Sequence, residues 1–335
     1  MFRLNVEQST FGVMTNELSA LIIGYRRSIN IESLIRSCIN NNVKKIYIAL
    51  DNVIDKSKDS QAFQDHLDCR KIIDTAMQSN PGLIEFAIQE RNVGCAVGVL
   101  SACNWFFSEV NYGIVLEDDC IPSSDFFKLV VDQFNNLEAN PNAWLICGTQ
   151  LVTYDQNLQG AYLSKYALTW GWATTSIKWV EMYRAITVKN NTPRSFLQVI
   201  NPENSYWFYG ALRAELGYVD VWDTVLLHRM MQNEKMSILP YQNLIENIGS
   251  DDVATHTKGG SLSKQLNLGT YCHTSNIKSD VLMDELIKKK IYRISYSHLI
   301  RNRMRRLIDI LTKSFQNQTP LIKKIDEANL VYFKS

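Results

Sequence analysis

The chain lacks a long apolar run, a marked excess of charge of either sign, and a high content of proline. Its 335 residues include 7 prolines, and the formal net charge is +1. Apolar runs such as Gly113–Leu116 are far shorter than the roughly 20 residues that span a bilayer. Residues 1–19 show no charged-then-apolar signal pattern. We therefore expect a cytoplasmic protein that contacts the inner face of the cell membrane only peripherally, and no nucleic-acid partner.

Several signatures of cofactor and metal proteins are also missing. The seven cysteines form no CxxC pair, and their odd number argues against a disulfide framework. We expect reduced, mostly buried thiols, as in cytosolic proteins. Neither a GxGxxG nor a GxxxxGK[ST] motif occurs, which disfavours NAD-binding and P-loop proteins. The five histidines lack the spacing of a zinc site.

What is present is an alternation of apolar runs and helical spacing through the first 116 residues. It predicts strands at 20–24, 45–50, 83–88 and 113–116, and helices at 29–41, 60–79 and 97–110. This order predicts an α/β fold with a Rossmann-like, mostly parallel sheet flanked by helices. Ligands of such sheets bind outside the carboxyl ends of the strands.

The second half of the chain is less regular. The pattern there predicts helices near 194–200 and 222–233, a strand-like segment at 237–244 and a mobile polar loop at 249–280. We expect one catalytic domain at 1–275. Its nucleotide-binding half would span about 18–150, and its acceptor half about 151–275.

The remainder, 276–335, forms a predicted helical tail of different character. Between Lys288 and Lys324 it carries eleven basic residues and a single acid, Asp309, interspersed with leucine and isoleucine. That pattern is typical of a basic amphipathic helix. Such a tail could rest on an anionic membrane surface, pack on the catalytic domain or join subunits of a homo-oligomer, and the pattern leaves these open.

The sharpest local signal is an apolar strand that runs directly into Glu117, Asp118 and Asp119. Three adjacent carboxylates repel one another unless a cation or water screens them. A hard divalent ion with oxygen ligands would do so, and it could also bridge to a diphosphate. The alternative is a solvated turn before the helix that Pro122 begins.

Two tryptophans stand close together in the second half. Trp170 and Trp172 could offer flat faces to the apolar C–H groups of a sugar ring. Aromatic side chains as often fill a core, and the sequence does not decide between these roles.

At the acidic segment the chain resembles the GT-A fold glycosyltransferases, whose acidic "DXD" motif follows the fourth strand. The match is Leu116-Glu117-Asp118-Asp119 followed by Pro122-Ser123-Ser124-Asp125-Phe126-Phe127. This version is similar to bacterial family-2-like enzymes and to the N-acetylglucosaminyltransferase I type. The resemblance implies that Asp119 binds Mn²⁺ (or Mg²⁺), and that Asp118 and Glu117 face the ribose and sugar of a nucleotide diphosphate sugar.

Further positions between about 18 and 258 match in order. The resemblance implies that Arg27 meets the diphosphate or base, that Asp51 reads a uracil ring and that the loop of Arg91 packs against the nucleotide. Many relatives carry Tyr-Asn-Arg-Pro at the first of these sites, so the residues on either side of Arg27 depart from the pattern. His256 would be a metal ligand or phosphate contact, although a lone histidine is more often structural.

A Trp-Asp pair after the metal motif holds the catalytic base in similar enzymes, so Asp223 is the candidate here. An inverting transfer needs a base that takes the proton of the acceptor hydroxyl. Asp223 could also cap the following helix, and the two roles are compatible.

These readings predict an inverting, metal-dependent hexosyltransferase or N-acetylhexosaminyltransferase. Its donor would be a nucleotide diphosphate sugar in which the nucleotide is UDP. Its carbohydrate acceptor would be a glycan or lipid-linked saccharide in surface polysaccharide synthesis. The alternatives are a nucleotidyltransferase of similar topology and a non-catalytic carbohydrate-binding protein. The runner-up enzyme should have a Gly-rich loop after the first strand, whereas residues 21–30 contain only Gly24.

Overall fold

The computed structural model describes residues 18–53, 59–152, 155, 157–187, 201–249, 267–295, 297, 300–301, 321–326 and 330–333. Four predicted features lie wholly or partly outside these residues. They are the helix at 194–200, residues 250–266 of the polar loop, His256, and residues 302–320 of the tail.

One nine-stranded sheet runs through the molecule in the order β11-β3-β2-β1-β4-β8-β6-β9-β7. From the pairings, β1, β2, β3, β4, β6 and β9 point one way, and β7, β8 and β11 point the other. The predicted mostly parallel sheet is therefore confirmed. The strands are β1 (Ser19–Gly24), β2 (Lys45–Leu50), β3 (Ile84–Gln89), β4 (Tyr112–Glu117), β6 (Ala143–Cys147), β7 (Ala161–Ser164), β8 (Trp172–Thr175), β9 (Met236–Pro240) and β11 (Leu330–Phe333). A separate pair joins β5 (Cys120–Pro122) to β10 (Ile245–Asn247).

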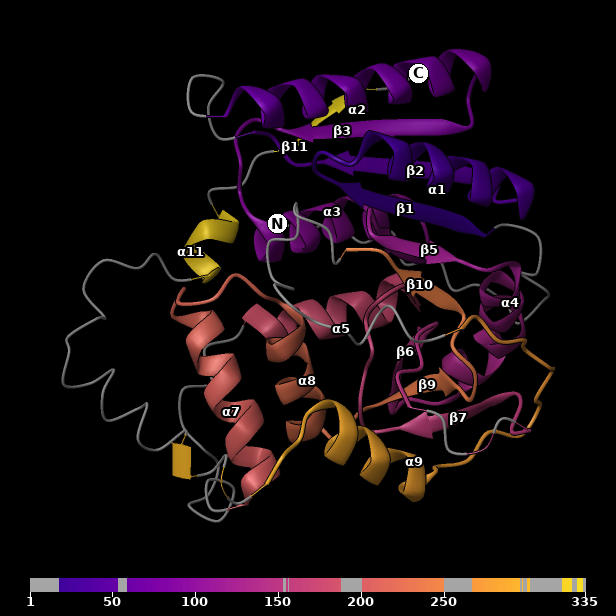
Figure 1. Cartoon of the computed structure of the whole chain (residues 1–335), viewed down its shortest axis with the longest axis vertical. Helices are drawn as coiled ribbons and strands as arrows, with labels where there is room; N and C mark the ends of the chain where they lie inside the picture. Colours follow the sequence, from indigo (N-terminus) through magenta and orange to yellow (C-terminus); the bar gives the residue numbers. More distant parts are fainter. Residues whose placement is uncertain are drawn as a thin grey trace.

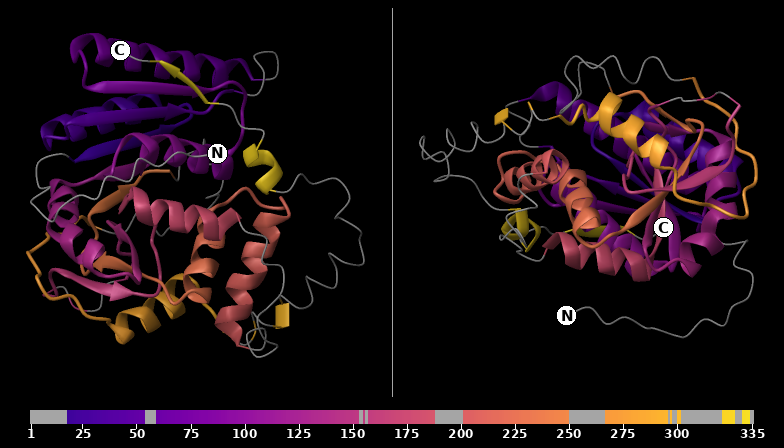
Figure 2. Two further views of the ribbon diagram at one scale, coloured as in Figure 1. Left: turned by 180° about the vertical axis from the view of Figure 1, so that it is seen from behind. Right: turned by 90° about the horizontal axis from the view of Figure 1, so that it is seen from below.

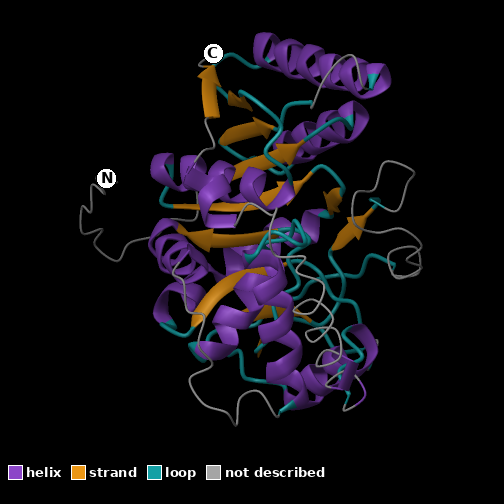
Figure 3. Cartoon of the chain, turned by 90° about the vertical axis from the view of Figure 1, so that its left-hand side faces the viewer, coloured by secondary structure: helices purple, strands orange, loops and turns teal. Residues whose placement is uncertain are grey.

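Helices flank this sheet, as Figure 3 shows from the side. In Figure 1, α1 and α2 lie with β1, β2 and β3 in the upper part, and α5, α7, α8 and α9 lie in the lower part. The helices are α1 (Ser28–Asn40), α2 (Ser60–Ser79), α3 (Cys95–Glu109), α4 (Ser124–Ala139), α5 (Ser176–Thr187), α7 (Pro202–Glu215), α8 (Asp223–Gln232), α9 (Val281–Leu286) and α11 (Leu321–Asp326).

The sheet divides the apolar core into two clusters. Along β1, Ala20 and Ile22 pack with α1 and α2, whereas Leu21 packs on the opposite side with α3. Side chains of a strand alternate between its two faces, so each cluster receives every second residue. Because both faces are covered, the strand reads as a continuous apolar run.

The predictions for the first half are confirmed to within two residues at each boundary. For example, the predicted strand 45–50 is β2 and the predicted helix 60–79 is α2. The predicted helix at 222–233 is α8.

The second half contains elements that the sequence analysis did not predict. Strands β6, β7 and β8 are only four or five residues long, and α7 lies in a stretch noted merely as aromatic. A short strand that is buried on both faces shows no alternation of apolar and polar residues. In α7 the many aromatic residues make the apolar spacing of a helix hard to recognise.

The tail contributes to the body of the molecule. Met283, Ile287 and Ile294 are buried in the core, and Lys288 belongs to the π-helical turn η2 (Ile287–Ile291) that continues α9. The last described segment, β11, is a strand antiparallel to β3, whereas the prediction was helix. Figures 1 and 2 show β11 at one end of the molecule and α9 at the other, so the two parts of the tail lie far apart.

All seven cysteines lie in described segments and are free thiols. Five of them are buried, which confirms that most of the thiols lie inside the protein. Among the helices that the structure describes, none is both long and apolar enough to cross a bilayer.

Candidate active site

A cavity of about 500 Å³ opens at the carboxyl ends of β1, β2 and β4, and on its other side the residues that lead into α8 line it. This volume is typical of a small-molecule site. Residues from both halves line it: Ile23, Gly24, Tyr25, Arg26, Arg27, Asp51, Asn92, Gly94, Cys95, Gly98, Val99, Glu117, Asp118, Asp119, Thr169, Trp170, Asp220, Val221, Trp222, Asp223, Asn247 and Gly249.

Asp118 is held in place by the turn after β1. Its carboxylate accepts the backbone N–H of Tyr25 at 3.0 Å and the Nη1 of Arg27 at 2.7 Å. Asn30 donates to its backbone carbonyl at 2.8 Å. Because β1 and β4 are neighbours in the sheet, the ends of the two strands meet, and the acidic segment is tied to the turn.

Glu117 and Asp118 are both shifted by their surroundings. Burial, together with the nearby carboxylates Asp119, Asp118 and Asp223 and against the opposing effect of Arg27, raises the pKa of Glu117 to about 8. Burial also raises the pKa of Asp118, and Arg27 opposes that shift. The cavity therefore disfavours full ionisation of these carboxylates and would favour an added cation.

Asp119 is the acid best placed to hold such a cation. Its side chain is one quarter exposed, and its Oδ2 lies 3.8 Å from Arg27 Nη1. Gly249 lies against it, since a Cβ at Gly249 would come within 2.2 Å of Oδ2. Among the residues that the structure describes, no group of three or more His, Cys, Asp or Glu side chains is arranged to hold a metal ion. The residues thus fit an ion that takes one carboxylate from the protein and its other ligands from phosphates and water.

Asp51 organises the loop after β3. Its carboxylate accepts the N–H groups of Asn52 at 2.8 Å, Val93 at 3.1 Å and Gly94 at 3.1 Å. Burial raises the pKa of Asp51 to about 6, although these three bonds lower it. The carboxylate that the resemblance assigns to a uracil ring therefore already has a structural task.

Asp220 performs a similar task from the other half of the chain. It accepts the N–H of Cys95 at 2.7 Å and that of Ala96 at 3.1 Å, and so caps α3. Burial, followed by the charges of Glu117 and Asp220, raises the pKa of the Cys95 thiol. A thiol in this setting is not an activated nucleophile.

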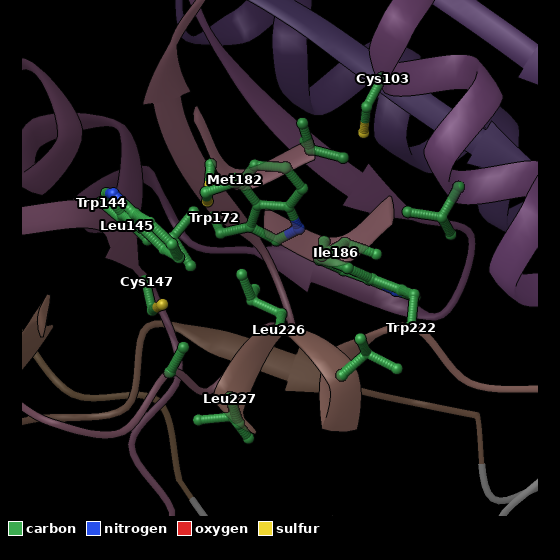
Figure 4. Packing of buried hydrophobic residues seen from close by; sticks show 14 of the residues in the cluster. Cys103, Trp144, Leu145, Cys147, Trp172, Met182, Ile186, Trp222, Leu226 and Leu227 are labelled. Carbon is green, nitrogen blue, oxygen red and sulfur yellow. The ribbon is translucent and has the colours of Figure 1, made fainter. Parts of the chain in front are cut away.

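Asp223 faces the cavity as the first residue of α8, and its Oδ1 accepts the N–H of Thr224 at 2.7 Å. The N-cap is Trp222, so Asp223 is not the capping residue itself. The Trp222 side chain is only 3% exposed, and its ring lies 5.6 Å from that of Trp172. Figure 4 shows both indoles among the buried apolar side chains that support the start of α8.

Aromatic side chains lie near Asp223. Burial raises the pKa of Tyr206 on α7, and the charge of Asp223 raises it further. The ring of Tyr206 lies edge-on to that of Trp207 and 6.4 Å from that of Tyr292, which follows η2. The tail thus reaches the neighbourhood of Asp223.

Most of the predicted site residues converge on this cavity. Those that line it are Arg27, Asp51, Glu117, Asp118, Asp119, Trp170 and Asp223. Arg91 is exposed and does not line the cavity, although its neighbour Asn92 does. Trp172 is 1% exposed and stacks on Trp179, so it belongs to the core and does not face a ligand. Its side chain packs in the apolar core against Phe107, Trp179 and Trp222.

The sequence analysis missed Asp220, and it did not predict that the glycines at 94 and 249 lie against carboxylates. The positive φ of Gly94, +83°, and the closeness of both glycines to carboxylates become visible only in three dimensions. Asp220 stands in a turn between two helices, where an acidic residue is unremarkable in sequence. Its closeness to Asp223 in the chain was the single available hint.

No protein-family profile matches this chain, and no curated protein matches it in sequence. Among solved structures, it is similar to the apo structure of the bifunctional glycosyltransferase WbbM. The TM-score is 0.31 and the identity 10%, over 53% of this chain and 35% of that one. The match thus spans about a third of the length of WbbM.

Two further structures are similar at the same level. One is a UDP-glucose pyrophosphorylase complexed with UDP-glucose, with a TM-score of 0.36 and 10% identity over 67% of this chain and 90% of that chain. The other is the galactosyltransferase LgtC in complex with donor and acceptor sugar analogs, with a TM-score of 0.33 and 8% identity over 64% and 70%. Likenesses this distant carry no argument about function, which rests on the geometry of the cavity.

Proposed function

We propose that this chain is an inverting, metal-dependent glycosyltransferase of the GT-A type. It moves a hexosyl or N-acetylhexosaminyl group from a UDP-sugar to a glycan or lipid-linked saccharide in surface polysaccharide synthesis. One observation carries the proposal: a single cavity brings the acids after β4 and the basic turn after β1 face to face with Asp223 on α8.

The nucleotide side supports a diphosphate donor. Arg26 and Arg27 supply positive charge at the end of β1, and Arg27 reaches both Asp118 and Asp119. Phosphate oxygens are strong acceptors for arginine. Asp51 and Asn92, at the ends of the neighbouring strands, offer the polar groups that a nucleobase or ribose needs.

The acids support a divalent cation, Mn²⁺ or Mg²⁺, bound at Asp119. When bound, such an ion would neutralise the charge that develops on the diphosphate leaving group. Asp118 is already engaged by Tyr25 and Arg27, so it would hold Arg27 in place beside the diphosphate rather than act as a metal ligand.

The transfer is a single displacement at the anomeric carbon of the donor sugar. The acceptor hydroxyl oxygen forms the new bond while the bond to the diphosphate oxygen breaks, and Asp223 takes the hydroxyl proton. Arg27 stabilises the departing diphosphate. General-base assistance of this kind contributes about 10²- to 10⁴-fold to the rate.

The first experiment measures thermal shifts with a set of nucleotide sugars, with and without Mn²⁺. We expect stabilisation by a uridine diphosphate sugar that requires the metal, and we expect Asp119→Asn to abolish this metal-dependent stabilisation. Asp125→Asn is the matched control, because Asp125 follows the same motif but accepts the N–H of Tyr271 outside the cavity.

Product analysis separates the alternatives. Release of a nucleoside diphosphate from the donor in the presence of Mn²⁺ supports the transferase. An inverted anomeric configuration of the product supports a single displacement. Release of pyrophosphate from a nucleoside triphosphate and a sugar phosphate would show a nucleotidyltransferase. Sugar binding without turnover of any donor would show a binding protein.

We also propose that the exposed part of the tail rests on an anionic membrane. Val281 and Leu282 are 73% and 48% exposed, and Lys289, Lys290 and Arg293 of the same segment are exposed as well. Apolar side chains next to lysines bind the interface of acidic lipid bilayers. Truncation cannot test this, because the core residues Met283 and Ile287 would be lost with the tail.

Neutralisation of two lysines is a cleaner test. Each lysine near an anionic leaflet contributes about 1 kcal/mol, so Lys289→Gln with Lys290→Gln should weaken sedimentation with phosphatidylserine vesicles roughly thirtyfold at low salt. Lys44→Gln with Lys71→Gln removes the same charge elsewhere and should have no effect. Equal losses from both pairs would mean that only net charge matters.

A further inference from the structure

The N-terminus of α3 is capped from a distant part of the chain. Gly94 is the N-cap residue, and its own neighbourhood supplies no side chain that accepts the first N–H groups of the helix. Asp220, more than 120 residues later, accepts those of Cys95 and Ala96. A carboxylate at this position accepts hydrogen bonds from N–H groups that have no partner within the helix. Its negative charge also lies at the positive end of the helix dipole.

The contact is closely fitted. Gly94 has a φ of +83°, and a Cβ on it would lie 2.3 Å from Asp220 Oδ2. Asp220 can reach the helix only because Gly94 has no side chain. On the other side of Gly94, Asp51 accepts the N–H groups of Val93 and of Gly94 itself. Carboxylates from the two halves of the molecule thus hold four consecutive N–H groups.

Asp220 also lies on the segment that carries Asp223. That segment leaves α7 through Gly217, which has a φ of +81°, and it ends where α8 begins. Trp222 fastens one end of it in the core, with 3% exposure. Asp220 fastens its middle to the nucleotide-binding half, and both carboxylates line the same cavity.

We propose that Asp220 is a positioning residue that sets the place of Asp223 across the cavity from the donor site. The bond to α3 couples the two halves, so that the base stands at a defined distance from the acids after β4. The inference rests on the proposed base role of Asp223. Asp220 itself does not touch the reacting atoms in this scheme.

Asp220→Asn and Asp220→Ala test the inference by two independent readouts. We expect faster amide hydrogen exchange at Cys95 and Ala96 and in residues 217–224. We also expect kcat to fall roughly ten- to a hundredfold, with the donor KM changed by less than about twofold, because misplacing a catalytic group costs turnover rather than binding. Asp280→Asn is the control, since Asp280 caps α9 outside the cavity.

A double-mutant cycle with Gly94→Ala isolates the contact. Gly94→Ala introduces backbone strain in any background, but its clash with the carboxylate exists only when Asp220 is present. We therefore expect Gly94→Ala to reduce kcat less in the Asp220→Ala protein than in the wild type. Circular dichroism and the melting temperature establish that each variant is folded.

The outcomes are distinct. A fall in kcat without faster exchange would overturn the inference, because Asp220 would then act on the substrate directly. Faster exchange with unchanged kcat would also overturn it, because the cap would serve α3 alone. If the wild type transfers no sugar, the proposed function fails, and the exchange of 217–224 alone decides whether Asp220 anchors the segment.

Discussion

On the sheet side of the cavity, Asp51 and the acids after β4 follow strands of one sheet, with β1 between them. On the helix side, Asp223 begins α8, and long-range contacts hold the segment that leads into it. The first side is built by the regular spacing of parallel strands. The second depends on Asp220 and on the packing of Trp222 against Trp172.

This difference suggests a division of labour. The carboxyl ends of neighbouring strands are held in fixed positions because each strand is hydrogen-bonded to the next. A diphosphate would therefore meet a preformed surface there. A turn held by one carboxylate and one indole is easier to displace. We therefore expect changes on the sheet side to alter donor binding, and changes on the helix side to alter turnover.

The largest expected effect is that of Asp223→Asn. The amide cannot take a proton, so turnover should fall at least about a hundredfold. Donor affinity measured by calorimetry should stay near the wild-type value, since the sheet edge is intact. If donor affinity is lost instead, Asp223 belongs to the binding side and the division fails.

The paired tryptophans give the next largest effect. Trp172→Ala should destabilise the fold by about 3–5 kcal/mol, because a buried indole is lost from the core. Trp170→Ala should cost clearly less stability but weaken sugar or nucleotide binding about five- to tenfold, since Trp170 lines the cavity. Urea unfolding and ligand titration measure the two quantities. Equal losses of stability would remove the distinction between the two residues.

The free energy of unfolding should depend on pH through Asp51, on the sheet side of the cavity. The pKa of Asp51 is raised from 3.8 to about 6, so the folded state holds this proton more tightly than the unfolded state does. The stability from this group is complete below pH 4 and is lost as the pH rises to about 6. The loss is at most about 3 kcal/mol. Unfolding measured from pH 4 to pH 7 should show this slope in the wild type and a smaller one in Asp51→Asn. Identical slopes would contradict the assignment.

The smallest effect concerns Asn30, which donates to the backbone carbonyl of Asp118. Asn30→Ala should remove one hydrogen bond worth about 1 kcal/mol. The donor dissociation constant should rise about fivefold while kcat stays unchanged. A matching fall in kcat would show that the two sides are not separable.

The sequence by itself determined the first four parallel strands and their helices. Each apolar run such as Lys45–Leu50 is buried on both faces and followed by a periodic helix, so local pattern suffices. It also located Asp51 and the three acids, because residues after parallel strands share one edge of the sheet. Asp223 came from a resemblance, and its catalytic role stays a prediction.

Only the tertiary structure decided which residues from the second half of the chain line the cavity. Trp170 and Trp172 are two residues apart, yet one lines the cavity and the other is core, because β8 begins at Trp172 and Trp170 lies in the loop before it. Likewise β11 joins the far edge of the sheet from the end of the chain, beside β3. The cap from Asp220 to α3 joins residues more than 120 positions apart, and no local pattern records such a contact. Distances between elements depend on the packing of the whole core, which a reading of local periodicity does not contain.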